Sequence, residues 1–363
     1  MDKIAEIWNR VERSLFPHLE ECLPSVTQKH KELVLILETL RVEDYVKPGW
    51  MHKIGRKPAD RKALSRAFVA KAHYNEPTTK SFLDRLKGDR SLRQICGWQK
   101  ISDIPSESTF SRSFEEFASS KLGDQVHKAR VVEYLGDDVA WHVNRDSTQI
   151  DGREKPAPKK KEEPKQKFRR GRPKAGEIRP PKKPSRTERQ ITQKHEESIA
   201  ELDCFCDVGT KIDSKGSKRH WVGYKLHVDV IDGCIPVSAV TTSASVHDSQ
   251  VAIPLAQMTA ERITSWYDLM DSAYDARLIR EHSQSLGHVP IIDRSARHGK
   301  VAPMEPDRGR RYNNRTTAER FNSRFKDGCG GRMVRVRGGR KVHLHLMFGV
   351  LVIFAQSLLN LAN

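Results

Sequence analysis

The chain has 363 residues, of which 37% are apolar, enough to build the cores of two or three domains of ordinary size. Lys and Arg number 65 against 47 Asp and Glu, which gives a formal net charge of +18. This composition excludes a wholly disordered chain, and so strong a positive field attracts polyanions, above all nucleic acid. The first residues lack the apolar core of a secretory signal, so we expect a cytoplasmic protein whose six cysteines are reduced.

Residues 1–133 predict an all-helical domain. Apolar residues recur at helical spacing, most clearly at Leu33, Ile36 and Leu40. Three shorter helices are expected near residues 79–86, 91–96 and 106–118. Compact helices joined by short turns are typical both of a helix-turn-helix DNA reader and of a plain helical bundle. The sequence leaves these two interpretations open.

A basic segment follows and interrupts the second domain, which we expect over residues 134–363. Residues 155–189 contain fifteen Lys or Arg, four Glu and seven Pro, with too few apolar residues to build a core. We therefore expect a flexible insertion over residues 152–198. Within it the sequence RRGRPK resembles an AT-hook, which implies that Arg170 and Arg172 enter the minor groove of A·T-rich DNA. A plain polybasic tether explains the segment equally well.

The pattern of the second domain changes to alternating strands and helices. A hairpin turns at Asp232-Gly233, and a capping box of Ser245 and Asp248 opens the helix that follows it. The expected strands are 139–146, 221–231, 235–242, 266–271 and 289–293, and the expected helices are 247–261, 274–286, 312–326 and 344–361. This order predicts an α/β fold with a mixed sheet flanked by helices. Polar residues interrupt the last helix, which indicates a buried helix and no membrane span.

Three carboxylates in this domain suggest metal chemistry. Asp146 and Asp271 each close a predicted strand, and Glu319 lies on the helix over residues 312–326. If the two strands are neighbours, their carboxylates lie at the same edge of the sheet. Three hard oxygen ligands suit Mg²⁺ or Mn²⁺, and two such ions support phosphoryl transfer. An isolated Asp at the end of a strand is more often a turn cap.

The predicted helix over residues 312–326 carries a charged stripe. At about 100° per residue, its members fall within about 60° of one another, opposite two phenylalanines. The stripe consists of Tyr312, Arg315, Glu319 and Lys326. A plain amphipathic helix also shows such a stripe, with Arg315 and Glu319 as an ordinary surface pair.

The spacing of these four residues resembles the Tyr-Arg-Glu-Lys signature of bacterial insertion-sequence transposases of the DDE class. The phrases RDSTQID at Asp146, YDLMDSAYDA at Asp271 and SLRQICGW at residues 91–98 resemble the same family. The resemblance implies a ribonuclease-H-like fold. Its catalytic, metal-binding residues would be Asp146, Asp271 and Glu319, and its phosphate-gripping residues would be Tyr312, Arg315 and Lys326.

The resemblance also implies the reaction. A transposase binds the terminal inverted repeats of its element, cleaves them with two Mg²⁺ or Mn²⁺ ions per active site, and joins the 3′ ends to target DNA. We therefore expect DNA as partner, a homodimer or larger assembly on it, and a place at the bacterial nucleoid. A metal-dependent nuclease on the same fold and an inactive DNA-binding descendant are the alternatives. Lys225, on a predicted strand, is a further candidate phosphate contact.

Overall fold

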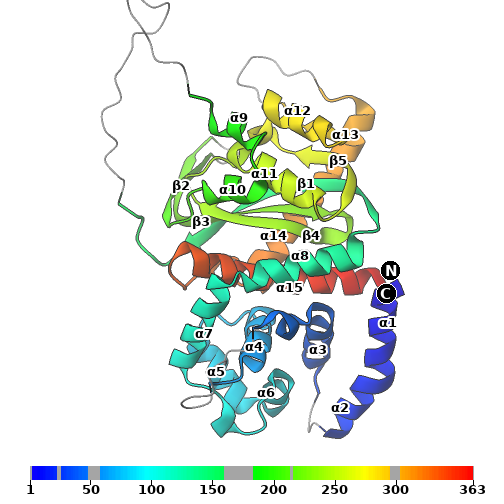
Figure 1. The fold of residues 1–363 in the computed structure, drawn as a ribbon, viewed down its shortest axis with the longest axis vertical. Coiled ribbons are helices and arrows are strands. Elements are labelled where there is room, and N and C mark those ends of the chain that lie inside the picture. Colours follow the sequence, from blue (N-terminus) through cyan, green and yellow to red (C-terminus); the bar gives the residue numbers. More distant parts are fainter. Residues whose placement is uncertain are drawn as a thin grey trace, which may run out of the picture.

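A long C-terminal helix separates the two parts of the molecule. The computed structural model describes residues 2–22, 26–47, 58–158, 183–212, 216–294 and 303–362. Helix α15 (Gly339–Ala362) runs between a helical bundle on one side and a mixed sheet on the other (Figure 1). The predicted α/β fold with a mixed sheet flanked by helices is confirmed. Arg170 and Arg172 lie outside the described residues.

The bundle contains the helices that the N-terminal sequence predicts. Three of them begin at Thr27, Thr78 and Asp89, whose side chains accept hydrogen bonds from backbone N–H groups of the first turn. The helices are α1 (Asp2–Arg10), α2 (Phe16–Cys22), α3 (Gln28–Leu40), α4 (Arg61–His73), α5 (Thr79–Gly88), α6 (Arg90–Cys96), α7 (Glu107–Ser119) and α8 (Leu122–Leu135), with a π-helical turn at Val11–Leu15 and 3₁₀ turns at Val42–Tyr45 and Ile101–Asp103.

The sheet has seven strands, with β1 near its centre. Strand β1 pairs antiparallel with β3 and parallel with β5, and the main order is β2-β3-β1-β5-β6. The predicted hairpin is present as β3 and β4, and β7 extends the sheet beside β1. The strands are β1 (Val139–Gly152), β2 (Asp207–Ile212), β3 (Lys218–Ile231), β4 (Ile235–Ser243), β5 (Thr264–Met270), β6 (Val289–Ile292) and β7 (Met333–Val334).

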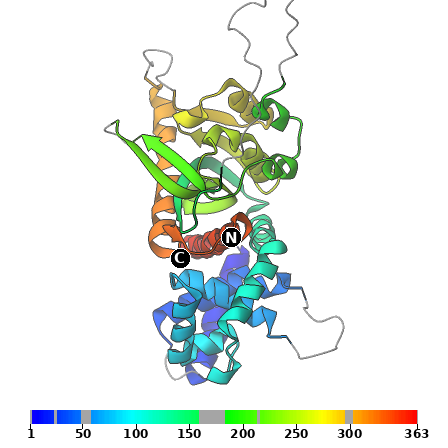
Figure 2. The same cartoon turned by 90° about the vertical axis from the view of Figure 1, so that its left-hand side faces the viewer.

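Helices cover both faces of this sheet (Figure 2). On one face Ser283 of α12 donates a hydrogen bond to Asp268 of β5, and on the other Asn322 of α14 donates one to Asp146 of β1. The first layer holds α9 (Arg186–Gln190), α10 (His195–Ala200), α11 (Ala252–Ala260) and α12 (Arg277–Ser285), and the second holds α13 (Pro306–Tyr312) and α14 (Thr316–Gly328). Helices α9 and α10 form at the C-terminal end of the expected insertion and lie beside α11.

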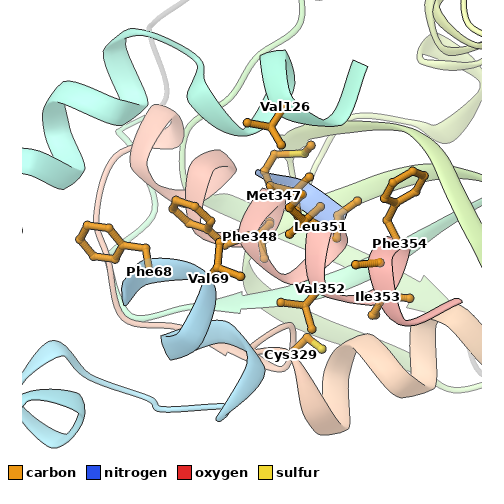
Figure 3. Close-up of a cluster of buried hydrophobic side chains, with 14 of the residues drawn as sticks. Phe68, Val69, Val126, Cys329, Met347, Phe348, Leu351, Val352, Ile353 and Phe354 are labelled. Atoms are coloured by element: carbon orange, nitrogen blue, oxygen red, sulfur yellow. The ribbon is translucent and has the colours of Figure 1, made fainter. Parts of the chain in front are cut away.

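One hydrophobic core joins the bundle to the sheet, and α15 is its centre (Figure 3). Phe348 stacks on Phe68 of α4, with ring centroids 5.7 Å apart, while Phe354 meets His127 of α8 edge to face. The helix is long and apolar enough to cross a membrane, but 83% of its 18-residue apolar stretch is buried inside the protein. Its apolar surface therefore belongs to the core, as the sequence predicts.

Several predicted element boundaries are wrong; α15, for example, begins at Gly339 and not at residue 344. Strand β1 continues through Asp146 to Gly152, because its distal residues pair with β3 and β7 over long sequence distances. The predicted helix over residues 312–326 is divided by a 3₁₀ turn, Asn313–Arg315, which separates α13 from α14. Helix α11 begins only at Ala252, because Asp248 belongs to a 3₁₀ turn and pairs with Lys225 instead of forming a capping box.

We predict that Phe348→Ala destabilises the whole chain by about 3–5 kcal/mol, the usual cost of emptying a Phe site in a core. The side chain is 2% exposed and links α15 to the bundle. Urea unfolding followed by circular dichroism measures the change. Val132→Ala, at a side chain that is 44% exposed, is the control. A loss below about 1 kcal/mol for Phe348→Ala would contradict the shared core.

Candidate active site

The register of the parallel strands β1 and β5 places Asp146 beside Asp271. Arg145 of β1 pairs with Met270 of β5, so the next residue along each strand is one of the two acids. Side chains alternate along strands, which turns both carboxylates to the face covered by α14. The two predicted acids are therefore neighbours, although Asp146 lies within its strand and not at the end of it.

Burial makes both carboxylates harder to ionise. Only 16% of the Asp146 side chain is exposed, and this burial raises its pKa to about 6, against a smaller lowering by Arg315 and a further rise from Asp271. Burial also raises the pKa of Asp271, although the backbone N–H of Ala273 and the guanidinium of Arg315 oppose the rise. Asp271 Oδ1 accepts the Ala273 N–H at 2.9 Å, so it also caps the turn that follows β5.

Arg315 connects Glu319 to the pair of aspartates. Its Nη2 donates to Glu319 Oε1 at 2.8 Å, and its Nη1 lies 3.8 Å from Asp146 Oδ1. The 3₁₀ turn that holds Arg315 contacts β1 and β5, which brings the guanidinium over the carboxylates. The predicted pair of Arg315 and Glu319 is thus present, and the side chain of Glu319 is 56% exposed on the first turn of α14.

Asn322 and Tyr312 complete the surroundings of Asp146. Asn322 lies one turn after Glu319 on α14, and its Nδ2 donates to Asp146 Oδ2 at 3.0 Å. Its Oδ1 is buried and has no hydrogen-bond partner among the described residues. The Tyr312 ring lies 6.0 Å from the Arg315 guanidinium, and burial raises the pKa of its hydroxyl. Sequence reasoning did not identify Asn322, although its spacing from Glu319 places it on the same side of the helix.

Lys326 lies further along α14, at a polar hollow of about 320 Å³. The hollow is lined by Gln149, Asp151, Ser323, Lys326, Asp327 and Arg332. Burial lowers the pKa of Lys326, and the nearby charge of Lys211 on β2 lowers it further. Lys211 could not be predicted from the sequence, because only the pairing of β2 with β3 brings it to this edge of the sheet.

Lys225 is engaged in an ion pair. Its Nζ donates to Asp248 Oδ1 and to the carbonyl oxygen of Val246, both at 2.9 Å, and its side chain is 14% exposed. Asp248 also forms a hydrogen bond with Ser147, which follows Asp146 along β1. The structure therefore brings Asp248 close to the aspartates and gives Lys225 a carboxylate partner.

The face of the sheet opposite the two aspartates contains a buried ion pair. Arg145 donates through Nε and Nη2 to the two carboxylate oxygens of Asp229, at 2.9 and 2.7 Å. Thr259 of α11 donates to the same carboxylate at 2.6 Å. These contacts fix β1 against β3 and α11, and so they fix the backbone that carries Asp146.

A second group of possible metal ligands lies elsewhere. His195 Nδ1 is 2.9 Å from Glu261 Oε1, and its Nε2 is 3.4 Å from Glu196 Oε1. Within the described part of the chain, these three residues alone bring three such ligand atoms within 4.8 Å of one another. Both glutamates are exposed, and Glu261 also pairs with Lys128. Glu319 therefore does not converge with the two aspartates to that distance.

The mixed sheet and its two helical layers are those of an α/β fold with a ribonuclease-H-like domain. Residues 186–355 match the model of a transposase DDE domain, and residues 19–116 match that of a transposase domain called DUF772. The chain therefore belongs to the insertion-sequence transposases of the DDE class. The first match includes Asp271 and Glu319 and begins after Asp146. No curated protein and no solved structure gives a significant match to the chain.

We predict that Asp146→Asn stabilises the protein at neutral pH. The raised pKa of Asp146 means that the folded state binds this proton more tightly than the unfolded state, so ionisation costs stability between about pH 4 and 6. Above about pH 6 the full cost is present, and the variant should gain on the order of 2 kcal/mol. Near pH 4 the gain should vanish. Urea unfolding at pH 4 and 7 tests this, and a variant less stable than the wild type at pH 7 would contradict it.

Proposed function

We propose that this transposase binds the terminal inverted repeats of its insertion sequence, cuts them by metal-dependent phosphoryl transfer and joins the 3′ ends to target DNA. The observation that carries the proposal is the adjacency of Asp146 and Asp271 on parallel strands, with Glu319 tied to them through Arg315. Two neighbouring, partly buried carboxylates whose ionisation is disfavoured destabilise the folded chain at neutral pH. A functional site explains their presence better than a structural role does.

The donor set fits hard divalent cations such as Mg²⁺ or Mn²⁺. Asp146, Asp271 and Glu319 would hold two ions, and the unpartnered Oδ1 of Asn322 is a further oxygen donor at the same place. When bound, such ions activate a water or a DNA 3′-hydroxyl and stabilise the leaving oxygen. To help hold an ion, Glu319 would have to release its hydrogen bond with Arg315.

The basic and hydroxyl groups beside the acids have different roles in this proposal. If Glu319 binds metal, the planar guanidinium of Arg315 is free to bind the phosphate next to the cut. Lys326 would neutralise a phosphate further along α14, and the Tyr312 hydroxyl would donate a hydrogen bond to the same strand. Lys225 would orient Asp248 behind the site, because its ammonium group is already paired there.

DNA contacts outside the active site complete the proposal. We assign assembly and end recognition to the helices of residues 1–133, and nonspecific attraction to the basic insertion with Arg170 and Arg172. Strand transfer joins two ends at once, so we expect a homodimer or larger assembly on DNA in the bacterial cytoplasm. A nuclease that cuts without joining is the main alternative, and an inactive DNA-binding descendant is the other.

We predict that Glu319→Gln abolishes cutting and joining while it leaves end binding nearly unchanged. The substitution keeps the size of the side chain and removes only its charge, so a metal ligand is lost without a cavity. Purified protein is incubated with a labelled element end, a plasmid target and Mg²⁺ or Mn²⁺, and products are separated on gels. Binding is measured by fluorescence anisotropy in parallel.

Glu281→Gln is the matched control, because it makes the same change at a glutamate that is 50% exposed on α12 and pairs with Arg277. It should retain cutting and joining. Full cutting by Glu319→Gln would contradict the assignment of Glu319. Cut ends without joined product from the wild type would indicate a nuclease, and binding alone would indicate an inactive descendant.

A further inference from the structure

A groove lined by arginines runs along β6, beyond the acids. Its volume is about 510 Å³, and β6 is the edge strand of the sheet on this side. Helix α12 forms one wall and α13 the other. The polar and aromatic side chains that line it are Tyr267, Arg280, Gln284, Asp307, Arg308 and Arg311.

Two arginines of α13, Arg308 and Arg311, are held in place by neutral partners. The Arg311 guanidinium lies over the Tyr267 ring, 4.3 Å from its centroid, and Arg308 Nη2 donates to the carbonyl oxygen of Pro290 at 3.0 Å. Neither forms an ion pair within the described part of the chain, so both keep their positive charge available. Arg280 pairs with Asp275, and Asp307 is neutralised by Arg310, which does not line the groove.

The groove leads towards the candidate active site. Tyr267 lies on β5, and Asp271, the residue that follows the strand, is four residues further on and therefore faces the same side of the sheet. Four strand residues span about 13 Å, and one nucleotide of a DNA strand rises about 3.4 Å. A strand whose scissile phosphate lay at the acids would therefore meet this groove about four nucleotides away.

We propose that this groove binds the phosphate backbone of a DNA strand about four nucleotides from the cut, through Arg308 and Arg311. Arginine forks match phosphate oxygens, and phosphate contacts fix the register of a protein on DNA without reading its sequence. The Tyr267 ring and the Pro290 carbonyl hold the two guanidinium groups in place before DNA arrives. The groove thus sets which phosphate reaches the carboxylates. This inference rests on the proposed function, because only a cutting enzyme needs that register.

The first test measures end binding by fluorescence anisotropy in EDTA, so that metal chemistry does not enter. Arg308→Gln and Arg311→Gln are combined, which removes two charges and keeps most of each stem. We expect weaker binding and a plot of log affinity against log salt that is shallower by about two, one for each lost phosphate contact. Thermal unfolding confirms that the variant is folded.

Arg277→Gln is the matched control. Its side chain is 79% exposed on α12, and it pairs with Glu281, which does not line the groove. It should leave affinity and salt dependence nearly unchanged. A double variant that behaves like this control would contradict the proposed phosphate contact.

The second test locates the contact. Single neutral methylphosphonate linkages are placed two to eight nucleotides from the cut, on either side. We expect the wild type to lose affinity when a neutral linkage lies about four nucleotides from the cut. The double variant, which already lacks the contact, should bind DNA with that linkage as well as it binds unmodified DNA. Equal losses for both proteins at every linkage would contradict the proposal. A wild type that binds ends through the groove but neither cuts nor joins with metal would refute the proposed function alone, whereas a wild type that binds no DNA would refute both.

Discussion

The buried ion pair between Arg145 and Asp229 is the contact on which the site depends. It ties β1 to β3, and Thr259 of α11 binds the same carboxylate. A buried pair is not in itself evidence of high stability, but the loss of one partner would leave an uncompensated charge in the core. Because successive residues of a strand point to opposite faces, fixing Arg145 on one face presents Asp146 on the other. The parallel register with β5 then supplies Asp271 beside it.

Local patterns predicted most of the fold. The alternation of β3 and β4 around Asp232-Gly233 and the helical spacing in the bundle depend on near neighbours, and the structure confirms both. The end of β1 was missed because residues 147–152 are largely polar and gain their strand partners from β3 and β7. The 3₁₀ turn before α14 was missed for a similar reason. It lies against β1 and β5, and an ideal helical projection contains no such contact.

The sequence predicts the acidic residues of the site better than it predicts the residues around them. The position of Asp271 after a strand and the four-residue spacing of Arg315 and Glu319 indicated real neighbours. Asn322 was overlooked because an uncharged amide gives no signal of its own. Asp248 was assigned to a helix cap because its partner Lys225 is distant in sequence. The groove along β6 is invisible in the sequence, since it forms only where α12, α13 and the edge strand meet.

We propose that Asp146, Asp271 and Glu319 together hold the metal ions required for DNA cleavage. Anomalous scattering from crystals of the transposase with an element end and Mn²⁺ tests this proposal most directly. We expect Mn²⁺ between Asp146 and Asp271, with Glu319 turned away from Arg315 to coordinate it. Mn²⁺ at His195, Glu196 and Glu261, with none at the aspartates, would contradict it.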